Sequence, residues 1–85
     1  MANGGDPEEF RKRDRVEAAV HMRTIAGNRP GDTIKDRITR ACERLNWGYA
    51  RCEEIWRQRA RRIEAWELDA LRSFVHRDDD WENSQ

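Results

Sequence analysis

The chain has 85 residues, of which 40% are charged, and its 17 Lys and Arg are balanced by 17 Asp and Glu. This length sets a limit of one small domain and leaves no room for a sizeable enzyme cavity, because so short a chain buries too little surface. The zero net charge excludes a uniformly basic DNA-coating protein and a uniformly acidic tail protein, although charges of opposite sign can still be sorted along the chain.

The first predicted helix follows a short polar N-terminus. Residues 1–7 include a Gly-Gly pair, and we expect them to be disordered. Residues 9–26 contain no Gly or Pro, which favours a helix. Its apolar stripe is thin and consists of Val16, Ala19, Val20 and Met22.

The second predicted helix, residues 33–45, begins after a break at residues 27–31, Gly-Asn-Arg-Pro-Gly. Asp32 or Thr33 can cap it, and Thr33 with Asp36 three residues later approximates a capping box. Apolar residues recur on one face over three turns, which makes this the clearest helix in the sequence. These residues are Ile34, Ile38, Ala41, Cys42 and Leu45.

A third helix is predicted over residues 48–59, after a tight turn in which Asn46 or Gly48 takes a positive φ. Its apolar face consists of Tyr49, Cys52, Ile55 and Trp56. A fourth helix is predicted over residues 63–76. Its stripe consists of Ile63, Trp66, Ala70, Leu71 and Phe74. We interpret residues 77–85 as an acidic disordered tail and expect a small all-α domain of three to four helices.

Several classes of protein lack support in the sequence. No run of 18 apolar residues exists, so no membrane span is predicted. The first ten residues have no apolar signal-peptide core, and a cytoplasmic location is therefore expected. Two cysteines and two distant histidines match neither a metal site nor a catalytic constellation, so we expect no metal, no cofactor and no enzymatic activity. Cys42 and Cys52 are expected to be buried thiols.

The charges are sorted along the chain. Residues 1–34 hold six cations and six acids, residues 35–62 hold nine cations and four acids, and residues 63–85 hold two cations and seven acids. The predicted second and third helices are therefore basic, and the C-terminal part cancels their charge. Arginine outnumbers lysine by 15 to 2, which suits bidentate pairing with phosphate or guanine edges.

Two short helices joined by a tight turn within a basic segment match a helix-turn-helix. The outer face of residues 48–58 is then the recognition surface, with base-contacting candidates Arg51, Glu54, Arg57 and Gln58. The candidates for phosphate contact are Lys35, Arg37, Arg40, Arg44, Arg61 and Arg62. The alternative for each residue is an exposed surface charge with a local helical partner.

Residues 41–56, together with 60–63 and 66–71, resemble small helix-turn-helix proteins of alphaproteobacterial phages and mobile elements. The resemblance covers about half of the chain, and the usual glycine after the alanine of the turn is missing. It implies a transcriptional regulator or an excisionase-like factor that binds double-stranded DNA.

A DNA-binding unit of this size reads only a half-site, so a homodimer is expected. Either the apolar stripe of the first helix or the C-terminal helix can form its interface. The alternative function is a protein-interaction module, such as an anti-activator or adaptor, that binds a regulatory partner through exposed aromatic residues and arginines. Its aromatic candidates are Trp66, Phe74 and Trp81. The acidic end can also fold back onto the basic helices as an autoinhibitory segment.

Overall fold

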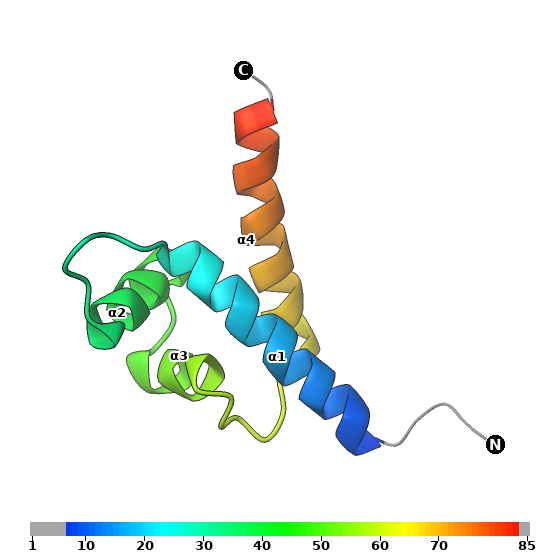
Figure 1. The fold of residues 1–85 in the computed structure, drawn as a ribbon. Helices are drawn as coiled ribbons and strands as arrows, with labels where there is room; N and C mark the ends of the chain where they lie inside the picture. Colours follow the sequence, from blue (N-terminus) through cyan, green and yellow to red (C-terminus); the bar gives the residue numbers. More distant parts are fainter. Residues whose placement is uncertain (1–6, 84–85) are drawn as a thin grey trace.

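The computed structural model describes the backbone of residues 7–83 and the side chains of residues 8–76. The described chain consists of four α-helices without strands: α1 (Pro7–Ala26), α2 (Ile34–Leu45), α3 (Tyr49–Trp56) and α4 (Ala65–Asn83). The long helix α1 packs against the other three, and α2 also packs against α3 (Figure 1). The predicted class, a small all-α domain, is confirmed.

The helix ends follow local chemistry. Thr33 and Asp36 form the predicted capping box at the start of α2: the Asp36 N–H donates to Thr33 Oγ1 (3.0 Å) and the Thr33 N–H donates to Asp36 Oδ2 (3.1 Å). The end of α4 differs from the prediction, because the helix continues to Asn83 where a disordered tail was expected from residue 77. The expected N-terminal disorder falls almost wholly on residues 1–6, outside the described backbone.

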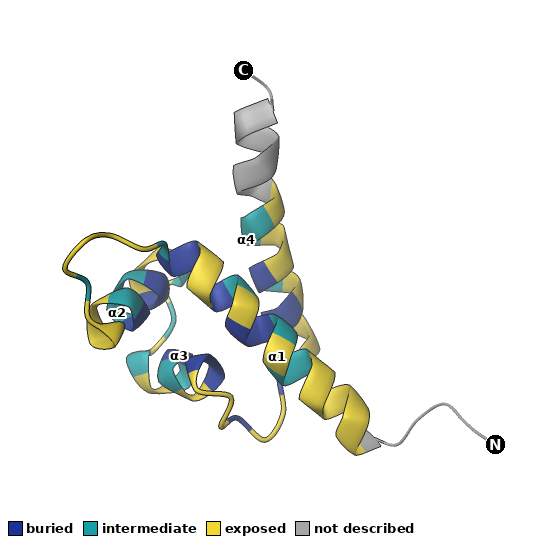
Figure 2. Cartoon of the chain, viewed as in Figure 1, coloured by how far each residue is buried: buried dark blue, intermediate teal, exposed yellow. Residues whose placement is uncertain are grey.

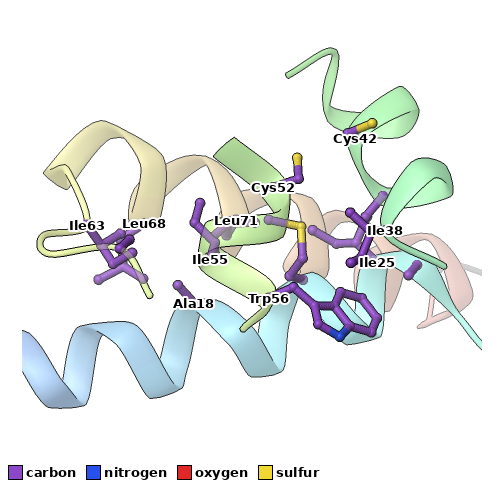
Figure 3. Packing of buried hydrophobic residues seen from close by; sticks show 14 residues of the cluster. Ala18, Ile25, Ile38, Cys42, Cys52, Ile55, Trp56, Ile63, Leu68 and Leu71 are labelled. Atoms are coloured by element: carbon purple, nitrogen blue, oxygen red, sulfur yellow. The ribbon is translucent and has the colours of Figure 1, made fainter. Parts of the chain in front are cut away.

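The core lies between α1 and the other three helices (Figures 2 and 3). Its fully buried large side chains are Met22, Ile25, Ile38, Cys52, Ile55 and Leu71. The predicted stripe of α1 is partly wrong: Val16 and Val20 are about half exposed, whereas Ala18 and Ile25 are buried. Positions 18, 22, 25 and 26 have the i, i+4, i+7, i+8 spacing of one helical face, so this face meets the other helices.

The predicted stripe of α4 is also partly wrong. Leu71 is buried as predicted, but Trp66 is exposed and Ile63 precedes the helix. Leu68 and Glu67, which were not predicted, are buried instead. Leu68 and Leu71, three residues apart, form the inner face, while Phe74 and Val75 are half-buried against the same core. The face of α4 that packs against the core therefore differs from the face that its large aromatic residues predicted.

Candidate nucleic-acid interface

The connection between α2 and α3 consists of residues 46–48 and is as tight as predicted. Asn46 takes the left-handed conformation (φ 62°), while Gly48 is extended and precedes the first turn of α3. The N–H groups of Trp47 and Asn46 donate to the carbonyls of Cys42 (3.0 Å) and Glu43 (3.3 Å), the pattern of a Schellman motif. A three-residue turn of this kind is the connection length of a helix-turn-helix.

Three arginines of α2 that were predicted to contact phosphate are bound within the fold. Arg37 Nε donates to the Gly27 carbonyl (2.9 Å), Arg40 donates to the Ala26 carbonyl (2.8 Å), and Arg44 donates to the Ile25 carbonyl. The last carbonyls of a helix lack intrahelical partners and form the negative end of its dipole. These arginines therefore stabilise the C-terminus of α1. The remaining cation of α2, Lys35, is exposed and has no partner among the described side chains.

Two carboxylates that accept hydrogen bonds from arginines of the fold are held in their charged form. Hydrogen bonds from Arg72 lower the pKa of Glu17 to about 2, with a further contribution from His21. Arg40 and the Arg29 N–H lower the pKa of Asp32 to about 2. The first pair joins α1 to α4, and the second joins α2 to the loop before it.

These lowered pKa values predict acid-sensitive stability. A carboxylate whose pKa is lower in the folded than in the unfolded chain stabilises the fold fully above its ordinary pKa, here 4.5 for Glu17 and 3.8 for Asp32. That stabilisation is lost as the pH falls towards 2. We expect the decrease in Tm between pH 5 and pH 2 to be smaller in Glu17→Gln than in the wild type. Glu43→Gln, at a surface carboxylate without an ion pair among the described residues, should keep the wild-type decrease. Equal decreases in all three proteins would refute this role for Glu17.

Arg51, the first predicted base-contacting residue, points into the domain. Its Nε and one terminal nitrogen donate to the two oxygens of Glu67 (2.8 and 2.6 Å), and the same nitrogen donates to the Arg62 carbonyl (2.9 Å). Glu67 is only 3% exposed and also accepts from the Glu64 N–H (2.9 Å). The Arg51 hydrogen bonds lower the pKa of Glu67 despite its burial. This pair joins α3, the following loop and α4.

The outer face of α3 differs from the predicted recognition surface. The helix ends at Trp56, because Gln58 takes a left-handed φ of 59° and the Arg59 N–H donates to the Glu54 carbonyl (2.8 Å), which closes a second Schellman motif. Arg57 is the C-cap and pairs with Glu53 (3.2 Å). Gln58 therefore lies beyond the helix. The exposed face of α3 presents Ala50 and Glu54, and Glu54 accepts from Arg51 (3.1 Å).

The loop between α3 and α4 meets the N-terminal half of α1 (Figure 1), and both segments carry exposed cations. Arg15 of α1 donates to the Arg61 carbonyl of the loop (3.2 Å), and buried Ala60 and Ile63 anchor the loop to the core. We name five exposed cations of these two segments the basic surface: Arg59, Arg61 and Arg62 of the loop, and Arg11 and Lys12 of α1. Of these, Arg11 and Arg62 line the same groove. Among the described side chains only Arg62 has an acidic partner, Glu64 at 4.0 Å.

Of the predicted phosphate contacts, the basic surface includes Arg61 and Arg62. Sequence reasoning did not select Arg11 or Lys12, because they lie in the N-terminal segment whose charges balance, and it did not select Arg59, which falls on the apolar side of the predicted third helix. The only sequence signal for them was that each lies in a cluster of cations, at residues 11–15 and 57–62. The fold brings these two clusters together.

The remaining reactive side chains are buried in the core or belong to a pair with a neighbouring carboxylate. Cys42 and Cys52 are buried free thiols, and burial raises the pKa of Cys52 to about 12, which disfavours its thiolate. His21 lies 3.0 Å from Glu17. Among the described residues, no group of three His, Cys, Asp or Glu side chains could hold a metal ion.

The two described aromatic residues of the predicted interaction module differ in exposure. Trp66 is 61% exposed and meets Trp47 edge to face at 5.6 Å between ring centroids. Phe74 is half-buried against the core, and Trp81 lies in the part of α4 whose side chains are not described.

Within the described part of the chain, every helix is too short or too polar to cross a membrane. Comparisons of the chain with protein-family models, with curated proteins and with solved structures found no match.

Proposed function

We propose that the protein binds double-stranded DNA and that the basic surface contacts its phosphates. The observation that carries this proposal is the distribution of partners among the cations. The arginines of α2 and Arg51 are bound to carbonyls or carboxylates of the fold, whereas Arg59 and Arg61 are exposed without an acidic partner among the described residues. Cations without internal partners can release the counterions of DNA, which is the main source of affinity for the phosphate backbone.

The tight α2–α3 connection supports double-stranded DNA as the ligand. Its three residues are the turn length of a helix-turn-helix, and the basic loop follows directly after α3. Docking through this loop brings the α3 face with Ala50 and Glu54 towards a groove, where Glu54 can accept from a cytosine amino group. Regulation of transcription, or an excisionase-like role, would follow from such binding and rests on the resemblance to phage and mobile-element proteins.

The test is a fluorescence-anisotropy titration with generic duplex DNA at several salt concentrations. A plot of log affinity against log salt has a negative slope. Arg59→Ala with Arg61→Ala should make this slope shallower by about two, because each lost phosphate contact contributes about 0.9. The affinity at low salt should fall by roughly tenfold or more, in proportion to the lost contacts. The matched control is Arg29→Ala with Lys35→Ala, which removes two exposed cations from the loop after α1 and the first turn of α2.

The control variant should keep the salt slope and the affinity at low salt near the wild-type values. Equal losses in the two double variants would move the contact to α2, as the helix-turn-helix prediction has it. Absence of binding by the wild type at low salt would exclude DNA as the ligand.

The exposed Trp47–Trp66 pair supports a second candidate function, recognition of a regulatory protein. Tryptophan is favoured at the centre of protein interfaces. Under this function a Trp66→Ala variant loses its partner but keeps its fold and any DNA affinity.

A further inference from the structure

A groove with an apolar floor lies between the N-terminal half of α1 and the start of α4. Its volume is about 600 Å³, and its apolar lining consists of Phe10, Ile63, Ala65 and Leu68. Ile63 and Leu68 form a buried floor, whereas the Phe10 ring is 51% exposed. An exposed aromatic ring beside a hollow of this size leaves room for one large apolar side chain.

The groove also has a charged rim. Arg11, Arg62 and Arg72 line it together with Asp14 and Asp69. Arg72 is already paired with Glu17 at 2.6 Å, whereas Arg11 has no acidic partner among the described residues and Arg62 lies 4.0 Å from the exposed Glu64. Arg11 and Arg62 are therefore the cations that can pair with an incoming segment. Arg59 and Arg61 are further exposed cations of the loop that supplies Arg62. The groove therefore suits an apolar side chain carried by an acidic segment.

The chain contains one segment of that composition. Residues 78–82 are Asp-Asp-Asp-Trp-Glu, four acids around a tryptophan. They belong to α4, which is one continuous helix from Ala65 to Asn83. At about 1.5 Å per residue, residue 80 lies ~18 Å along the helix axis from residue 68 in the groove. Because α4 extends away from the groove as a helix, this segment cannot fold back onto its own groove (Figure 1).

We propose that residues 78–82 of a second copy occupy the groove, so that two α4 helices pair in an antiparallel homodimer. If residue 80 of one copy lies opposite residue 68 of the other, the two-fold axis crosses α4 near Phe74. The same operation places residue 68 of the first copy opposite residue 80 of the second. Both grooves are then filled by equivalent contacts, and the assembly closes as a dimer.

This contact covers part of the basic surface. Arg11 and Arg62 belong both to the groove and to the proposed DNA contact. Dimer formation and phosphate binding therefore oppose each other, and by linkage DNA should dissociate the dimer to the same degree that dimerisation weakens DNA binding. The dimer itself does not depend on the proposed function.

The first test measures self-association of the full chain by sedimentation equilibrium. Changing Asp78, Asp79 and Asp80 together to Asn should weaken self-association at least tenfold, and Trp81→Ala should weaken it as well. The matched control removes three surface carboxylates from α2 and α3, by Glu43→Gln, Glu53→Gln and Glu54→Gln. It should self-associate like the wild type. A monomeric wild type, or an unchanged dissociation constant in the Asn variant, would overturn the proposal.

A charge exchange makes the test specific for this contact. One variant carries Arg11→Glu with Arg62→Glu, and the other carries Asp78→Lys, Asp79→Lys and Asp80→Lys. Each variant alone should be monomeric, because its own charges repel. Mixed in equal amounts, the two should form a heterodimer in which both contacts are complementary. Failure of the mixture to dimerise would contradict the assigned interface, whereas failure of DNA binding would leave these sedimentation results unchanged.

Discussion

Replacing Trp56 by alanine should destabilise the protein by about 3–5 kcal/mol, enough to unfold most or all of so small a domain. The Trp56 side chain is 4% exposed and closes the core at the end of α3. The guanidinium groups of Arg23 and Arg37 lie over its ring, 5.6 and 4.9 Å from the centroid. Because α3 has only eight residues, its helical structure depends on this packing.

Trp66→Ala is the matched control, since it makes the same substitution at a ring that is 61% exposed. We expect it to cost about 1 kcal/mol, the range of an edge-to-face aromatic pair. Thermal and urea unfolding of both variants measures the difference. Similar losses at the two positions would contradict the assignment of Trp56 to the core and Trp66 to the surface.

Arg51→Ala should destabilise the fold by about 3 kcal/mol, because it leaves the buried Glu67 carboxylate without its main partner. This value is at the lower end for a broken buried pair, since about a third of the Arg51 side chain reaches solvent. Urea unfolding measures the loss. The loss should be smaller at low pH, where the Glu67 carboxyl, whose pKa the pair lowers, becomes protonated.

Two comparisons isolate the Arg51–Glu67 pair. Arg57→Ala removes an arginine from an exposed pair on the same helix and should cost under about 1 kcal/mol. Arg51→Met with Glu67→Leu removes both charges and should recover most of the stability lost in Arg51→Ala, as apolar replacements of buried pairs often do. If Arg51→Ala instead weakens specific DNA binding without a loss of stability, the role of Arg51 is base contact.

The sequence predicted the features that depend on neighbouring residues. The capping box of α2 and the left-handed turn at Asn46 each involve groups a few residues apart, so local chemistry determines them. The apolar face of α3 was predicted for the same reason, and Cys52, Ile55 and Trp56 are buried.

The faces of α1 and α4 depend on which helices they meet, and local spacing did not determine them. Ala18 is a core residue because its small side chain allows close packing, but an alanine contributes little to an apolar stripe. Glu67 has its partner 16 residues earlier in the chain, so no local pattern indicated that an acid would be buried.

The candidate interface was predictable in composition and only partly in location. The sequence shows how many arginines each segment holds, but partners decide which of them can bind a ligand. Arg37 and Arg40 bind the carbonyls that end α1, because the fold places α2 against that end. The junction of the basic loop with α1 depends on a contact between residues 15 and 61, which only the tertiary structure defines.

The most direct test of the proposed interface is an NMR titration of the full chain with duplex DNA that follows the backbone amides and arginine Nε–H groups. We expect the largest shift changes at Arg59, Arg61 and Arg11, with Arg37, Arg40 and Arg51 unchanged because their guanidinium groups stay bound within the fold. Changes concentrated at Lys35 and the α2 arginines, or absent at Arg59 and Arg61, would contradict the assignment of phosphate binding to the basic surface.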